Sequence, residues 1–203
     1  MLENNFLIII IFIIFPYLIG SIPFGLIFSK LNGYGDIRKI GSGNIGATNV
    51  LRTGNKKLAL LVLFCDGFKG YLSIKMILII SLNNLSDIAL CLALVSVVLG
   101  HCFPIWLKFN GGKGVATILG SLLALNVFLG SIILISWVII ALLFKKSSLS
   151  SLISIFCIPL PILILFNINL SISFFIVFLI TTFRHKDNIF RLLQGKETNI
   201  LSK

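Results

Sequence analysis

The sequence predicts an all-α integral membrane protein, a single domain of about seven transmembrane helices with its N-terminus outside the cell and its C-terminus in the cytoplasm. Two observations predict this fold class. Of the 203 residues, 58% are apolar and 11% are charged, whereas a soluble domain is nearer half apolar and a quarter charged. The basic residues, which give a net charge of +11, gather in a few segments between apolar runs. The same figures exclude a disordered chain.

The first three predicted spans are residues 6–31, 58–82 and 87–107, because a helical crossing needs about 20 mainly apolar residues. The first run is softly broken at Gly20–Pro23. It lacks the basic start and the small-residue cleavage site of a signal peptide, so we expect it to remain as a helix. The second run carries three charged side chains, at Asp66, Lys69 and Lys75.

The remaining apolar sequence forms two long runs, residues 115–146 and 149–183, and each is too long for one crossing. Polar or turn-forming residues interrupt them at 126–130 and 167–169, so each run is predicted to fold back as two spans. Since the fourth and seventh spans are short, a total of five or six is the alternative.

The basic residues agree with seven spans, because Lys and Arg concentrate on the cytoplasmic side of membrane proteins. Six follow the first span, two lie between the third and fourth spans, two between the fifth and sixth, and five in the tail, which together are 15 of the 17 Lys and Arg. The opposite turns, at 83–86, 125–130 and 167–171, contain none. Only an odd number of spans with an external N-terminus gives this separation.

Cysteine spacing predicts neither a disulfide framework nor a metal site. The four cysteines are far apart and form no CxxC pair, so we expect them to be thiols in the core. They are Cys65, Cys91, Cys102 and Cys157.

The predicted cytoplasmic segment 32–57 is longer than an ordinary helix connection. It contains Gly41-Ser42-Gly43-Asn44-Ile45-Gly46, which lacks the surrounding strand and helix of a dinucleotide site. Small residues still let backbone N–H groups converge on an anion. Polar side chains and a guanidinium suited to phosphate follow, so the segment is predicted to bind an anion, and a flexible hydrophilic loop is the alternative. Its candidate residues are Ser42, Asn44, Thr48, Asn49 and Arg52.

The second segment, residues 108–114, resembles a phosphate loop at the start of an apolar helix. Its glycines and lysine are Gly111, Gly112, Lys113 and Gly114. The first glycine of a Walker A sequence is missing, so ATP hydrolysis is not indicated. Bare amides, a helix N-terminus and one ammonium predict an anion site. The alternative is a membrane turn that carries a positive-inside lysine.

The third segment, residues 184–203, begins with His185 and Asn188, which share one face of a helix at a spacing of three. Histidine titrates near neutral pH, so His185 is the candidate base. The alternative is a basic helix that holds anionic lipid.

Asp66 and Lys69 also lie three residues apart, within the second span. Intramembrane charges are usually paired or functional, so Lys69 is predicted either to pair with Asp66 or to contact substrate directly. The sequence has none of the motifs HExxH, GxSxG or HxxxxD and no carboxylate-rich magnesium site. We therefore expect no metal and no cofactor.

Five sequence blocks, in order along the whole chain, resemble the bacterial acyl-phosphate:glycerol-3-phosphate acyltransferases, the PlsY family. The blocks are GSIPFG from Gly20, GSGNIGATNVLR from Gly41, CDGFKG from Cys65, GHCFPIWLKFNGGKGVAT from Gly100 and RHKDNIFRLLQGKE from Arg184. Two positions depart from the usual pattern: Ile45 stands where the family mostly has proline, and Asn110 where it mostly has lysine.

The resemblance implies transfer of a fatty acyl group from acyl phosphate to the sn-1 hydroxyl of glycerol 3-phosphate, giving lysophosphatidate and phosphate for phospholipid synthesis. It assigns importance to Ser42, Arg52, Lys113, His185 and Asn188, and glycerol 3-phosphate to the glycine loop around Lys113. Either His185 or the phosphate of the substrate would then remove the hydroxyl proton, and the sequence does not choose between these two bases. Ser42 and nearby amides would stabilise the oxyanion. It implies a multi-pass protein of the bacterial inner membrane, with its active site on the cytoplasmic face, that contacts membrane lipid, uses no nucleic acid and needs no obligate protein partner.

Two other classes remain open on the residues alone. A phosphate or organophosphate transporter would also use cationic loops and broken helices, although transporters usually show internal repeats and a mid-membrane site. A non-catalytic lipid-binding scaffold is the third possibility.

Overall fold

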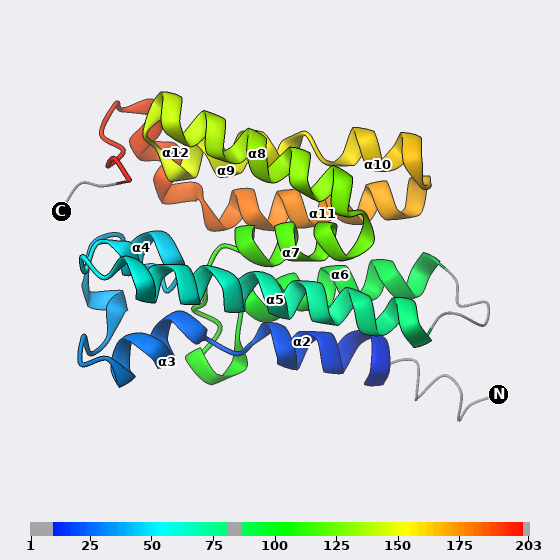
Figure 1. Ribbon diagram of the computed structural model, residues 1–203, viewed down its shortest axis with the longest axis horizontal. Helices are drawn as coiled ribbons and strands as arrows, with labels where there is room; N and C mark the ends of the chain where they lie inside the picture. Colours follow the sequence, from blue (N-terminus) through cyan, green and yellow to red (C-terminus); the bar gives the residue numbers. More distant parts are fainter. Residues whose placement is uncertain (1–9, 81–86, 201–203) are drawn as a thin grey trace.

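The computed structural model describes residues 10–80 and 87–200, and throughout these ranges the regular structure is helical (Figure 1). The elements in chain order are η1 (Ile10–Ile14), α2 (Phe15–Gly20), α3 (Phe24–Leu31), η2 (Ile37–Lys39), α4 (Ala47–Leu51), α5 (Lys56–Ile80), α6 (Asp87–Cys102), η4 (Ile105–Leu107), α7 (Val115–Leu125), α8 (Val127–Phe144), α9 (Ser147–Phe156), α10 (Pro159–Leu165), α11 (Ile168–Arg184) and α12 (Lys186–Leu193).

Four helical stretches in the described ranges are long and apolar enough to cross a membrane: Phe12–Leu31, Asp87–Leu107, Val127–Phe144 and Ser147–Leu165. The pair α11 and α12, bent by 66°, makes a fifth if it is taken as one span. Helix α5 has 25 residues but carries five charged side chains, two of them in its first turn. Helix α7 has only 11 residues, about 17 Å of helix, which is roughly half of the hydrocarbon thickness.

The helix boundaries lie close to those predicted from the sequence. The chain turns between α7 and α8 at Asn126 and between α10 and α11 at Asn167, inside the two predicted interruptions. Each asparagine accepts a hydrogen bond from a backbone N–H of the helix that follows, at 2.9 Å, which is how an N-cap satisfies a helix start. The turn predicted at 83–86 lies outside the described residues.

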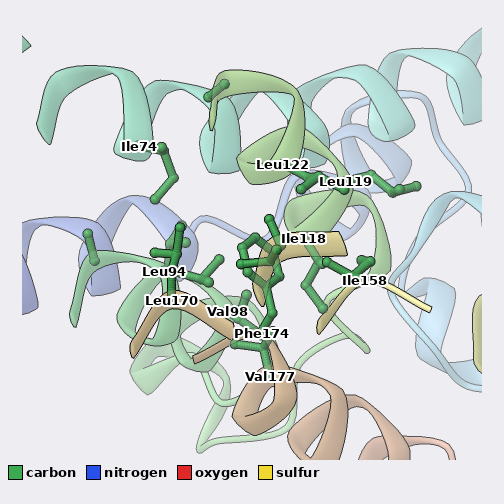
Figure 2. Packing of buried hydrophobic residues seen from close by; sticks show 14 of the residues in the cluster. Ile74, Leu94, Val98, Ile118, Leu119, Leu122, Ile158, Leu170, Phe174 and Val177 are labelled. Carbon is green, nitrogen blue, oxygen red and sulfur yellow. The ribbon is translucent and has the colours of Figure 1, made fainter. Parts of the chain in front are cut away.

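Helix α7 lies in the middle of the bundle, between α5 and α8 (Figure 1). Its Ile118 and Leu122 are fully buried and pack with residues of α5, α6 and α11, among them Phe174 and Val177 (Figure 2). A Cβ on Gly120 would lie 1.9 Å from the carbonyl oxygen of Gly67 on α5. Backbone therefore packs directly on backbone between α5 and the middle of α7, which fixes the position of α7 relative to α5.

All four cysteines are free thiols. Cys102 is buried, but Cys157 is exposed, so the prediction that all four lie in the core is wrong at this position. Cys157 follows the end of α9, where the outer face of the helix is apolar and exposed. A thiol is apolar enough to stand on such a surface.

Candidate active site

One end of the bundle contains a cavity of about 540 Å³, a volume typical of small-molecule sites. All three segments singled out in the sequence border it, together with parts of α5, α7, α8 and α9. In Figure 1, α4 and α12 lie at this same end although they are far apart in the chain. The predicted site residues on the cavity wall are Ser42, Asn44, Thr48, Asn49, Arg52, Lys113, Gly114, His185 and Asn188. Lys69, Gly111 and Gly112 are not on it.

A chain of hydrogen bonds connects Lys113 to the C-terminal segment. The ammonium of Lys113 donates to Oδ1 of Asn188, and the amide of Asn188 donates to Oε1 of Glu197 at 2.6 Å. Ser148 and Arg191 donate to the same carboxylate, at 2.6 and 2.8 Å. These contacts fix both ends of the Asn188 carboxamide. Its oxygen therefore faces the lysine.

Burial and hydrogen bonding set the charge states of Lys113 and Glu197. It lowers the pKa of Lys113 to about 8, an effect that the nearby Glu197 carboxylate partly opposes. For Glu197 itself, burial would raise the pKa, but the hydrogen bonds from Ser148, Asn188 and Arg191 outweigh it and lower the pKa below its usual range. Near pH 7 the lysine is therefore mainly charged and the glutamate is ionised.

His185 is held as a neutral base at the corner between α11 and α12. Its ring is 2% exposed, and Nδ1 lies 2.8 Å from the carbonyl oxygen of Thr181. Because a carbonyl can only accept, Nδ1 carries the proton and Nε2 keeps its lone pair. Burial, reinforced by the charge of Lys113, lowers the pKa of His185 to about 4, so the ring is unprotonated near pH 7.

Asn49 shapes the first segment. Its side-chain nitrogen donates to the carbonyls of Ile37, Ile40 and Asn44, and its oxygen accepts from the backbone N–H of Ser42 at 2.9 Å and from the Ser42 hydroxyl at 3.2 Å. With 1% of its surface exposed, Asn49 has little capacity left for a ligand. It holds Ser42 in place at the cavity.

Two other residues of this segment contact the far side of the cavity. Thr48 hydrogen-bonds Ser147 of α9 at 3.1 Å, and Nη2 of Arg52 donates to Thr198. Among the described residues, no acceptor lies within hydrogen-bond distance of the buried Nε of Arg52. Arg52 is thus a cation on the cavity wall whose terminal Nη2 contacts the C-terminal segment.

The glycine loop differs from the expectation of bare amides. The N–H groups of Gly111 and Gly112 donate to the carbonyls of Cys102 and His101, at 3.1 and 3.0 Å, where α6 ends. Arg184 then donates to the carbonyl oxygens of Gly112 and Gly111, at 3.0 and 2.8 Å. Both faces of this backbone are therefore used within the protein.

The two glycines thus place Lys113 instead of presenting amides to an anion. Gly114, at φ +86°, takes the left-handed conformation that starts α7. It borders the cavity, where the first N–H groups of α7 have no partner within their own helix.

The ammonium of Lys69 contacts three groups of the protein: a carboxylate, a backbone carbonyl and an aromatic ring. It lies 2.8 Å from Oδ1 of Asp66, donates to the carbonyl of Ile22 at 3.0 Å and stands over the ring of Phe24. The residue is 3% exposed. This geometry supports the ion-pair alternative for Lys69 over direct contact with substrate.

Two residues that hold the candidate site together were not among the candidates from the sequence. Arg184 holds the glycine loop and Glu197 holds Asn188, and neither contact is local in the chain. The one available signal for Glu197 was its position as an acid within a basic tail. For Arg184 the signal was its spacing from Asn188 and Arg191, which places the three on one face of a continuous helix.

The inner part of the cavity is an apolar groove. Helix α7 forms its floor with Leu119, and α5 and α8 form its walls with Leu60, Leu63, Leu134 and Val138. All four wall residues are exposed, Leu60 to 65%. The groove is therefore open along these walls, and apolar side chains, which a bilayer can cover, form its edges.

Comparison with known proteins gives a consistent result. A family model described as glycerol-3-phosphate acyltransferase matches residues 10–195. Curated relatives named glycerol-3-phosphate acyltransferase include those of Ehrlichia canis, 46% identical over 190 residues (93% of this chain and 96% of the relative), and Pelagibacter ubique, 48% identical over 182 residues (90% and 92%).

Solved structures also resemble this chain. The crystal structure of PlsY, an integral membrane glycerol 3-phosphate acyltransferase, in its glycerol 3-phosphate form superposes with a TM-score of 0.86 and 35% identity, covering 97% of this chain and 95% of that one. Its lysophosphatidic acid form gives 0.84 and 34%, with the same coverage.

Proposed function

The chain belongs to the glycerol-3-phosphate acyltransferase family, and on that premise we propose that it acylates the sn-1 hydroxyl of glycerol 3-phosphate with acyl phosphate as the donor. It is an integral membrane enzyme of phospholipid synthesis. The observation that carries the proposal is the cavity, which joins a cationic end to an apolar groove open to lipid. That combination suits one polar phosphorylated substrate and one whose acyl chain lies in the membrane.

The cationic end matches the charge of the two substrates. Each phosphate carries up to about two negative charges at neutral pH, so the site must bring cations together. Lys113 and Arg52 both border the cavity. Arg184 and Arg191 are already engaged by the protein. We assign phosphate binding to Lys113 and Arg52, with support from the start of α7.

His185 is the proposed general base. Nε2 takes the proton of the sn-1 hydroxyl as its oxygen attacks the carbonyl carbon of acyl phosphate. Ser42 and nearby amides stabilise the resulting oxyanion. The new ester C–O bond forms, the bond between the carbonyl carbon and the phosphate oxygen breaks, and phosphate leaves with the electron pair. Incoming negative charge opposes the effect of Lys113 on the ring, so substrate binding raises the pKa of His185 toward a useful value.

The test is a donor comparison with the purified full-length chain. Labelled glycerol 3-phosphate is incubated with acyl phosphate, with acyl-CoA or with acyl carrier protein thioester, and lysophosphatidate is measured. We expect product only with acyl phosphate, and its loss in His185→Ala. Product from a thioester alone would overturn the donor assignment. Uptake of glycerol 3-phosphate into proteoliposomes without any product would instead favour the transporter alternative.

We further propose that the cavity faces the cytoplasm of a bacterial cell, on the strength of the segregated basic residues. In a cysteine-free background, a cysteine at Phe128, an exposed residue at the start of α8, should react with an impermeant maleimide added outside intact cells. A cysteine at the exposed Lys108 should react only after the cells are opened. The opposite labelling would invert the orientation.

The pH profile should report Lys113. Its pKa of about 8 in the free enzyme means that the ammonium is present below this pH and is lost as pH rises through it. We therefore expect kcat/KM, which reports groups of the free enzyme, to fall above a pH of about 8. Measurements above pH ~7 avoid the titration of the substrate phosphate near pH ~6. A profile that stays level to a pH of about 9.5 would contradict this assignment.

A further inference from the structure

One side chain of the apolar groove is aromatic, whereas its neighbours on the groove wall are aliphatic. Trp137, on α8, borders the cavity between Leu134 and Val138. It is the largest side chain of the groove wall and the one with a polar atom.

The indole of Trp137 is held in one orientation by α9. Its Nε1–H donates to Oγ of Ser151 at 3.0 Å. The Ser151 hydroxyl donates to the carbonyl of Ser147 at 2.8 Å, so its lone pair is left to accept the indole proton. Ser151 is 2% exposed. Neither partner can turn without losing a hydrogen bond that is at least partly shielded from solvent.

Membrane proteins often place tryptophan at the level of the lipid headgroups, where the apolar ring contacts lipid and the N–H group contacts water. Trp137 does not fit that description, because its N–H is satisfied by α9 and the residue lies seven positions before the end of α8, about 10 Å along the helix. Ile135 and Ile139, its neighbours on α8, are more than half exposed and stand outside the cavity.

From this arrangement we infer that Trp137, fixed by Ser151, is a specificity-determining residue for the acyl donor. The inference rests on the proposed function. A rigid ring on the wall of the groove sets the width available to the chain at that depth. Straight chains pack along the ring, whereas a bent chain collides with it, and a rigid, close-packed wall yields little.

The experiment compares two acyl phosphates of equal length, one straight and saturated and one with a mid-chain cis double bond. The readout is the ratio of kcat/KM for the bent donor to that for the straight donor. Trp137→Ala should raise this ratio about tenfold. An apolar pocket discriminates substrates that differ slightly in shape by a factor of about this size. Ser151→Ala should raise it less, because the ring stays but can turn. The KM for glycerol 3-phosphate should be unchanged in both.

Ile139→Ala is the matched control, since it removes an apolar side chain from the lipid-facing side of the same helix. It should leave the ratio at the wild-type value. Thermal unfolding of each variant separates loss of fold from change of specificity, and Trp137→Phe gives a second, milder opening of the groove.

An unchanged ratio in Trp137→Ala and Trp137→Phe with a normal unfolding temperature would overturn the inference. So would an equal loss with both donors, which marks a purely structural tryptophan. Absence of product from the wild-type chain with either donor would be different, because it would overturn the proposed function itself.

Discussion

Replacing Lys113 with methionine is expected to lower kcat/KM for glycerol 3-phosphate by about a thousandfold, the upper end of what one electrostatic contact in an active site contributes. Methionine keeps the length and the apolar stem but removes the ammonium. The Asn188 oxygen then loses its donor, and Glu197 loses a nearby positive charge. The loss therefore combines a missing phosphate contact with a misplaced Asn188. Steady-state rates with both substrates varied measure it.

Lys108→Met is the matched control, because Lys108 lies five residues earlier in the same connection and its side chain is exposed. We expect activity close to wild type, since an exposed charge contributes little. Comparable losses at Lys113 and Lys108 would show that the rate follows the overall positive charge of this face. Lys113 would then have no specific role.

Gly112→Ala should lower activity by about a hundredfold or more, although it removes neither a charge nor a proton-transfer group. A Cβ at this position would lie 2.0 Å from Nε2 of His101 and 2.8 Å from Cε1. The His101 ring is buried beside Asp66, with Nδ1 3.6 Å from its carboxylate, so the loop has to move. Lys113 follows the displaced residue directly, and a displacement of about 1 Å is costly in a preorganised site.

The steric origin can be tested in the His101→Ala background, where the obstructing ring is gone. If the clash is the cause, Gly112→Ala adds little further loss there, and the double-mutant cycle shows strong coupling. Equal losses in both backgrounds would point instead to the backbone of Gly112 as the functional group. Gly67→Ala provides the tolerated control, since its nearest neighbour would be 3.6 Å away and alanine favours a helix interior.

Local patterns in the sequence predicted much of this structure, because they depend on short-range physics. Apolar runs defined the helices, the asparagines at 126 and 167 marked two turns that they then cap, and the family resemblance is confirmed by the family model and the solved structures. The three polar segments do meet at one cavity. Charge segregation supplied the reason to expect them on one side.

The sequence was less informative about which polar groups remain available to a ligand. The presence of glycines in a sequence does not show which groups their backbone N–H groups bind. Here the carbonyls at the end of α6 lack partners within their own helix, and they accept hydrogen bonds from the N–H groups of Gly111 and Gly112. Asn49 and Lys69 were similarly candidates for substrate, yet their hydrogen bonds and ion pair are made within the protein. Such contacts join residues of different segments, so chain spacing cannot reveal them.

The open apolar groove lined by α5 and α8 also bears on how the concentration of an acyl donor is expressed. A donor that reaches the site from within the bilayer is encountered in two dimensions, and its chance of entering depends on its share of the surrounding lipid. Adding detergent or phospholipid at a fixed amount of donor dilutes it as surely as adding water dilutes glycerol 3-phosphate. For such a donor the KM is a mole fraction of the membrane, while the KM for glycerol 3-phosphate remains a molar concentration.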